Sequence, residues 1–223
     1  MIGTESSTEA GSFLDVDGIK TFFMERGDGE AVVLIHGAAP GACSQVSWQP
    51  NLDPLAKAGF WVIAYDQPGF GRSGRPEDDS LEYRVQHAKA FIDALGLTHY
   101  HLIGSLEGAY VAAGLALEDA RVDRLVLVSA GALVPSDSDK AATTPNEGSV
   151  PPRPLVDDLP KLTPKTMILW GKNDPGAAVE RALLLFNLIP GAELHVFDEC
   201  GDGVQVDQAT RFNQVVGAFL QAG

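Results

Sequence analysis

The chain has 223 residues, of which 45% are hydrophobic and 21% charged, and its formal net charge is −14. This length and composition predict one globular domain with a sizeable core. The acidic balance argues against nucleic acid and anionic membranes as partners, because both carry the same sign of charge as the protein. No apolar run reaches the roughly 20 residues needed to cross a bilayer.

The two cysteines, Cys43 and Cys200, are too few for a disulfide framework, and we expect both to be free in a cytoplasmic protein. Residues 1–11 are polar and acidic and lack the basic and apolar regions of a signal peptide. We therefore expect residues 1–11 to form a disordered tail and residues 12–223 to form a single domain.

Hydrophobic runs and turn residues predict strands that alternate with helices along this domain. The first element is a hairpin over residues 12–26, with its turn at Asp17 and Gly18. Further strands are expected at 31–35, 60–65, 99–104, 124–129, 166–170 and 193–197, and helices near 48–58, 80–95, 108–118, 177–188 and 207–221. This alternation predicts an α/β fold with a mostly parallel, doubly wound sheet of about eight strands.

The segment 131–163 interrupts the alternation. It begins with a polar stretch, carries five prolines between Pro145 and Pro160, and shows no helical period. We interpret it as a linker that crosses the surface, not as a domain.

The junction between the strand at 99–104 and the helix at 108–118 carries Gly104 and Gly108, four residues apart. This is the spacing of a nucleophile elbow, G-x-S-x-G, in which two small residues let the chain turn sharply. The middle position holds Leu106, and a hydrocarbon side chain cannot attack a carbonyl. A chance pair of glycines at a strand–helix boundary would give the same spacing.

A shifted frame would make Ser105 the nucleophile. Ile103 and Glu107 would then occupy the two positions that need small side chains. Counting from the strand and from the helix also leads to Leu106 from both sides, so we favour Leu106 at the bend.

Four other segments fall in an order that supports the elbow reading: His36–Ala42, Asp66–Ser73, Trp170–Asp174 and Phe197–Gln205. With the elbow they resemble the landmarks of the α/β-hydrolases over about residues 12–222. The loops at 36–42 and 197–205 are most similar to those of the meta-cleavage-product hydrolases, which cleave carbon–carbon bonds. The resemblance implies the α/β-hydrolase fold, an oxyanion loop at 36–42, and a triad acid at Asp174.

The chain departs from this family pattern in three places. Leu106 stands at the nucleophile position, Asp202 stands at the histidine position, and the lid is absent or reduced to the linker 131–163. Only Asp174 matches the triad, so ordinary acyl-enzyme hydrolysis is not expected.

We looked for groups that could replace the missing ones. The five histidines are His36, His87, His99, His101 and His195. The resemblance gives the first a structural role, and the others are expected on a surface helix or within strands, away from the site. Cys43 lies in the oxyanion loop, where a thiolate would need a cation or a helix terminus to form; Cys200 is interpreted as structural.

Three acidic residues are the candidate catalytic residues: Glu107, Asp174 and Asp202. All three fall on loops expected at the carboxyl ends of the strands, where open α/β sheets bind ligands. Crowded carboxylates can share and move protons. The same pattern would arise if Asp174 were a relic, Glu107 capped or flanked its helix, and Asp202 were a solvated loop residue. The backbone amides of the loop Gly37, Ala38 and Ala39, together with the amide of Glu107, are expected to polarise a carbonyl.

These features predict a non-serine enzyme that acts on a small carbonyl or ester-like compound by carboxylate acid/base catalysis, as a lyase, cyclase, isomerase or atypical hydrolase. The alternative is a catalytically inactive pseudohydrolase that binds a small ligand or a protein. A third hypothesis is ordinary hydrolysis through Ser105 or Cys43.

We expect a small-molecule ligand, no cofactor and no metal ion, because no histidine spacing demands one, although three carboxylates can hold a divalent cation. A homodimer stays open, because a second subunit would cover a cleft that has no lid.

Overall fold

The computed structural model describes residues 11–134 and 153–222. Its strands are β1 (Ser12–Val16), β2 (Ile19–Arg26), β3 (Glu30–Ile35), β4 (Phe60–Tyr65), β5 (Tyr100–Ser105), β6 (Val122–Val128), β7 (Lys165–Gly171) and β8 (Glu193–Phe197). Its helices are α1 (Ser44–Lys57), α2 (Leu81–Ala94), α3 (Glu107–Glu118), α5 (Glu180–Leu188), α6 (Val204–Asp207) and α7 (Ala209–Gln221), with short 3-10 turns η1 (Gly131–Leu133) and η2 (Leu159–Lys161).

The eight described strands form one sheet in the order β1-β2-β4-β3-β5-β6-β7-β8. The first two strands pair antiparallel, and β2 also runs antiparallel to β4, whereas every other pair is parallel. The hairpin between β1 and β2 turns at Asp17 and Gly18, which both have a positive φ. The predicted α/β-hydrolase fold, with a mostly parallel sheet of about eight strands, is therefore confirmed.

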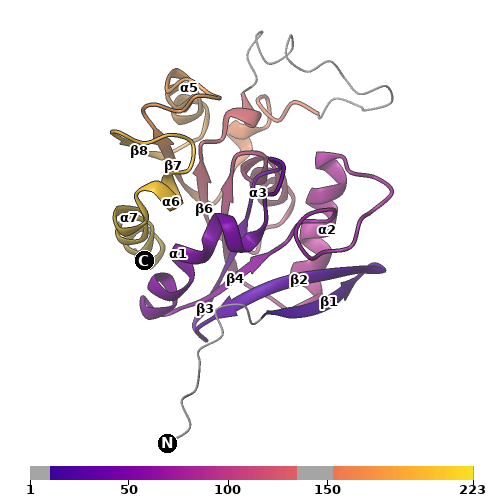
Figure 1. Ribbon diagram of the computed structural model, residues 1–223. Coiled ribbons are helices and arrows are strands. Elements are labelled where there is room, and N and C mark those ends of the chain that lie inside the picture. Colours follow the sequence, from indigo (N-terminus) through magenta and orange to yellow (C-terminus); the bar gives the residue numbers. More distant parts are fainter. Residues whose placement is uncertain (1–10, 135–152, 223) are drawn as a thin grey trace, which may run out of the picture.

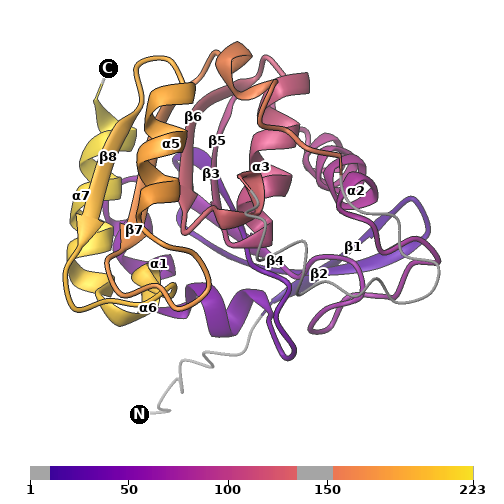
Figure 2. The same ribbon diagram turned by 90° about the horizontal axis from the view of Figure 1, so that it is seen from above.

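Helices cover both faces of this sheet, with α2, α3 and α5 on one face and α1, α6 and α7 on the other (Figures 1 and 2). The central strand β3 shows why the sheet needs two covers. Its residues Val33 and Ile35 belong to the core under α2 and α3, whereas Val32 and Leu34 belong to the core under α1 and α7. A strand buried on both faces explains the continuous apolar run in the sequence.

Two element boundaries differ from the prediction for identifiable reasons. Helix α1 begins at Ser44, earlier than expected, because Asp66 Oδ1 accepts hydrogen bonds from Ser44 N at 2.7 Å and from Ser44 Oγ at 2.6 Å. The C-terminal helix expected at 207–221 is divided into α6 and α7 at Gln208, whose ψ of 45° is not helical.

The described ends of the expected linker 131–163 pack closely against the domain. Leu133 is buried just after β6, and Leu155, Leu159 and Leu162 are buried in the core that contains α3. Residues 135–152 of this linker and residues 1–10 of the expected tail lie outside the described residues. Across the described part of the chain, the model contains no helix long and apolar enough to span a membrane.

Candidate functional site

The turn between β5 and α3 is a tight bend with a single residue at its tip. Leu106 has φ 54° and ψ −122°, a strained conformation for a residue with a branched side chain. Glycine is required on both sides. A Cβ on Gly104 would lie 2.3 Å from the Gly108 carbonyl oxygen, and a Cβ on Gly108 would lie 2.4 Å from the Ile35 carbonyl oxygen. The bend therefore has the geometry expected of an elbow.

Ser105 is the last residue of β5 and is only 1% exposed. The next amide, that of Leu106, donates to the Val128 carbonyl at 3.0 Å, which fixes the start of the bend against β6. The geometry therefore places Leu106, and not Ser105, at the tip.

His36 supports the loop that follows β3. Its ring is completely buried, with Nδ1 2.6 Å from the Gly37 carbonyl oxygen and Nε2 accepting a hydrogen bond from Gln67 N at 3.0 Å. Burial lowers the pKa of His36, so the ring stays neutral and fixes this loop against the next one. This contact pattern is structural, as the sequence indicated.

The side chain of Glu107 reaches across to the same loop. Its Oε2 accepts a hydrogen bond from Ala38 N at 2.9 Å. Glu107 is also the first residue of α3, so its own amide is among the helix donors that have no acceptor within the helix. Of the two amides expected to polarise a carbonyl, the Ala38 amide is therefore already bound to the Glu107 carboxylate.

A cleft of about 490 Å³ lies above the bend. Its lining includes Leu106 and all three candidate acids, Glu107, Asp174 and Asp202, together with Ala39 from the loop after β3. The expected convergence of these residues is therefore present, and Leu106 contributes an apolar wall. Gly37 lies directly behind, since a Cβ there would be 3.0 Å from the Leu106 Cβ.

Asp174 is held by one oxygen and leaves the other unpaired. Its Oδ1 accepts hydrogen bonds from Gly176 N and Ala177 N, each at 2.8 Å. Its Oδ2 is buried and has no hydrogen-bond partner among the described residues. A buried acceptor without a donor costs free energy, so this oxygen is suited to a bound group that donates a proton.

Neither cysteine is placed to act as a nucleophile at the cleft. Cys43 precedes α1 and lies outside the residues that line the cleft. Burial, reinforced by the nearby Asp207 carboxylate, raises the pKa of Cys200 to about 11, which keeps this thiol protonated near neutral pH.

The four other histidines also lie away from the cleft lining. His87 lies on the helix expected near 80–95, on the inner face of that helix: its side chain is 2% exposed, and its Nε2 is 3.1 Å from the Thr21 hydroxyl. Helix α2 packs this face against the β1–β2 hairpin, so the polar residue is satisfied internally. His99, His101 and His195 lie at or before strand residues, as expected.

The sequence missed several residues of the cleft, notably Ser129, Tyr110, Arg153 and Arg181. Ser129 follows β6 with φ 46°, and its buried Oγ has no hydrogen-bond partner among the described residues. Its place at the carboxyl end of a strand was a readable signal. Arg153 comes from the expected linker, and no local pattern indicated that this segment returns to the site.

A family model described as the alpha/beta hydrolase fold matches residues 30–150, more than half of the chain. The chain belongs to this family. The match spans the oxyanion loop, the bend and the β6 edge of the cleft, so the features described above lie in the part of the chain that carries the family signal.

Several similar proteins are named as hydrolases of related compounds. The chain is 28% identical over 284 positions to a 2-hydroxy-6-oxononadienedioate/2-hydroxy-6-oxononatrienedioate hydrolase of Klebsiella pneumoniae, covering 97% of each chain. A protein of the same name from Dechloromonas aromatica is 26% identical, with 92% of each chain covered. A meta-cleavage product hydrolase of Pseudomonas fluorescens, solved as a serine-to-alanine variant complexed with acetates, superposes with a TM-score of 0.80 at 28% identity, over 94% of this chain and 97% of that one.

These relatives correct the functional prediction. They are named as hydrolases, including enzymes that hydrolyse meta-cleavage products, and they match nearly the whole chain. The prediction of a non-serine enzyme of the lyase, cyclase or isomerase kind is therefore wrong, and so is the alternative of an inactive binding protein. The findings point instead to an active hydrolase. The prediction gave too much weight to the single position Leu106 and too little to the loops and glycines around it that match the family.

Proposed function

We propose that the chain is a hydrolase that cleaves a bond next to a carbonyl group in a small dicarbonyl compound, of the kind named for its relatives. The observation that carries this proposal is a cleft large enough for a small molecule, lined by Ala39 and Glu107, with two candidate amide donors: Ala38 N on the loop after β3 and the amide of Glu107 at the start of α3. Two such donors stabilise the negative charge that develops on a carbonyl oxygen during attack.

The bend position is the first departure that this proposal must accommodate. We assign Leu106 to the position where the family carries its nucleophile, because it alone has the bend geometry between Gly104 and Gly108. Since Leu106 supplies no oxygen, we assign the attack to the Ser129 hydroxyl, which lies in the cleft wall and whose buried Oγ has no hydrogen-bond partner among the described residues. The acyl group that forms on Ser129 is then released by one water.

Asp174 and Asp202 are the carboxylates proposed to move the proton of this hydroxyl. Asp174 presents an unpaired buried Oδ2, and Asp202 lines the same cleft from the loop after β8. A carboxylate that accepts the hydroxyl proton raises the nucleophilicity of the oxygen, and it can return the proton to the leaving carbon. Glu107 is assigned a different role, as a competitor for the Ala38 amide, because its carboxylate already accepts from it.

A reduced lid is also part of the proposal. The alignment with the Klebsiella pneumoniae relative runs over 284 positions, more than the 223 residues of this chain, so the relative carries segments without a counterpart here. Arg153 and Pro154, from the expected linker 131–163, line the cleft where a lid would otherwise cover it.

The test is steady-state hydrolysis of a 2-hydroxy-6-oxo-dienedioate and of p-nitrophenyl acetate. General acid/base catalysis contributes about 10²–10⁴-fold, so Asp174→Asn and Asp202→Asn are each expected to lower kcat by at least about 100-fold. Asp198→Asn is the matched control, because Asp198 is 75% exposed and pairs with Lys172 at 2.9 Å outside the cleft. Unchanged kcat in both cleft variants, or no turnover in the unmodified chain, would contradict the proposal.

Attack by Ser129 agrees with the 28% identical solved relative, which was studied as a serine-to-alanine variant. It predicts that Ser129→Ala loses turnover and that a fluorophosphonate labels Ser129 in the unmodified chain. Retained turnover in a folded Ser129→Ala variant, with no labelled serine in the unmodified chain, would contradict this assignment.

A further inference from the structure

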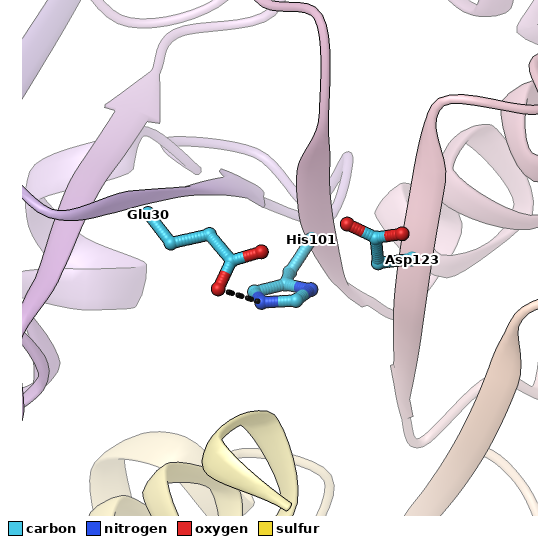
Figure 3. Close-up of side chains that lie close together, drawn as sticks. All are labelled: Glu30, His101 and Asp123. Atoms are coloured by element: carbon cyan, nitrogen blue, oxygen red, sulfur yellow. Dashed lines mark ion pairs between the residues drawn. The ribbon is translucent and has the colours of Figure 1, made fainter. Parts of the chain in front are cut away.

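A second cluster of polar side chains lies at the opposite edge of the sheet from the cleft. Glu30 is the first residue of β3, His101 the second of β5, and Asp123 the second of β6. These strands are adjacent in the sheet, and their parallel registers bring the three amino ends together. One atom from each side chain lies within 4.8 Å of the other two, and Figure 3 shows both carboxylates beside the imidazole.

His101 is the unusual member of this cluster. Its side chain is only 2% exposed, yet neither ring nitrogen makes a hydrogen bond within the described part of the chain. Burying both nitrogens of an imidazole without partners is unfavourable, and most buried polar atoms avoid it. Glu30 Oε2 lies 3.4 Å from Nε2, at the distance of an ion pair (Figure 3). The cluster therefore contains a buried imidazole that makes no hydrogen bond among the described residues and faces two acids.

The distances between these side chains suit the binding of one metal ion. Bonds from zinc to imidazole nitrogen and carboxylate oxygen are about 2.0–2.2 Å, so two ligand atoms of one tetrahedral ion lie roughly 3.4 Å apart. The Nε2 to Oε2 separation of 3.4 Å equals this spacing. The Asp123 carboxylate is exposed, and one of its oxygens lies within 4.8 Å of the other two ligand atoms, so it is the third candidate ligand.

The charges also favour a cation. Two carboxylates face one imidazole, and a neutral imidazole has a lone pair to donate to a metal ion. Arg124 and Lys165 line the same depression, and their positive charges act against the binding of a cation. Arg124 lies over the Phe219 ring, with its guanidinium carbon 5.3 Å from the ring centroid.

We propose that Glu30, His101 and Asp123 form a binding site for a divalent zinc ion, which joins the amino ends of β3, β5 and β6. One imidazole and two carboxylates give three protein ligands, and a fourth position would open into the depression of about 610 Å³ between these strands and the end of α7. Imidazole with carboxylate oxygens is a ligand set that zinc accepts. Because all three ligands stand on strands, the ion would brace the sheet at an edge remote from the cleft.

The experiment is calorimetric titration of the full chain with zinc chloride after dialysis against a chelator. One zinc per chain is expected, with a rise in melting temperature on binding. Even the outer-shell partners of metal ligands contribute about 10–100-fold in affinity. Losing a direct ligand in Glu30→Gln or Asp123→Asn is therefore expected to weaken binding at least about tenfold. Both replaced side chains are exposed and keep their shape, and circular dichroism checks that the variants fold.

Glu193→Gln is the matched control. His195 Nε2 lies 3.8 Å from Glu193 Oε2, so this pair has a similar histidine–glutamate contact without a third ligand. The proposal expects unchanged zinc affinity in Glu193→Gln and a zinc-dependent nitrogen chemical shift at His101 but not at His195. Absence of stoichiometric binding, or equal affinity in the Glu30→Gln and Asp123→Asn double variant, would overturn it.

Discussion

Replacing Glu107 by glutamine offers the sharpest test of how the cleft handles a carbonyl. The Glu107 carboxylate accepts the Ala38 amide at 2.9 Å, so a substrate oxygen must displace it to gain that donor. A hydrogen bond to a charged group contributes about 1.5–3 kcal/mol, and a neutral one about 0.5–1.5 kcal/mol. Glutamine keeps the shape and an acceptor oxygen but loses the charge, so displacement becomes easier by about 1.4 kcal/mol.

A difference of about 1.4 kcal/mol corresponds to roughly tenfold in rate. We therefore expect kcat/KM for the neutral ester p-nitrophenyl acetate to rise about tenfold in Glu107→Gln. The gain should be larger for a dienedioate substrate, because the variant also removes a negative charge facing an anionic ligand. Comparing kcat/KM for the two substrates separates two effects: the release of the Ala38 amide, which acts on both, and the loss of charge repulsion, which acts on the dienedioate.

Glu118→Gln serves as the control for this experiment. It makes the same charge change at the exposed last residue of the same helix, outside the cleft lining, and should leave kcat/KM unchanged. A folded Glu107→Gln enzyme with reduced kcat would refute the reasoning, because it would make the Glu107 carboxylate part of the chemistry and not a competitor for the amide.

Three further predictions follow from other parts of the molecule. Gly108→Ala should lower the free energy of unfolding by at least about 3 kcal/mol, because its Cβ would meet backbone oxygens at 2.4 Å. Gly217→Ala is the control: its nearest contact is at 3.8 Å, so the free energy of unfolding in urea should rise by up to about 1 kcal/mol. Burial lowers the pKa of His87 to about 4, so the unfolded chain binds the extra proton between pH 6.5 and 4 and stability falls as the pH drops through that window. His87→Gln should reduce the loss between pH 7 and 4.5 by about 2–3 kcal/mol in denaturant melts. Finally, the double change Leu106→Ser with Asp202→His should create a serine at position 106 that a fluorophosphonate labels. Absence of labelling at position 106 in the folded variant would contradict the assignment of the bend.

The sequence predicted most of the fold because the relevant signals are local. A continuous apolar run such as Val32–Ile35 identifies a strand buried on both faces, and the glycines at 104 and 108 identify the bend. It did not predict the hydrogen bond between Glu107 and Ala38, whose partners are 69 residues apart, nor the return of Arg153 to the cleft. Such contacts depend on how loops meet after the sheet has formed.

The sites at the two edges of the sheet differ in how well they can be predicted from the sequence. At the carboxyl edge each site residue follows its own strand, and the glycine spacing identified Leu106 while the family resemblance identified Asp174 and Asp202. At the amino edge the proposed zinc ligands stand inside strands, and only the register of β3, β5 and β6 makes them neighbours. Register is set by the whole sheet, because a shift of one residue would turn His101 to the other face. The ligands of such a site have no characteristic spacing along the sequence, so a search based on metal-binding motifs alone would miss it.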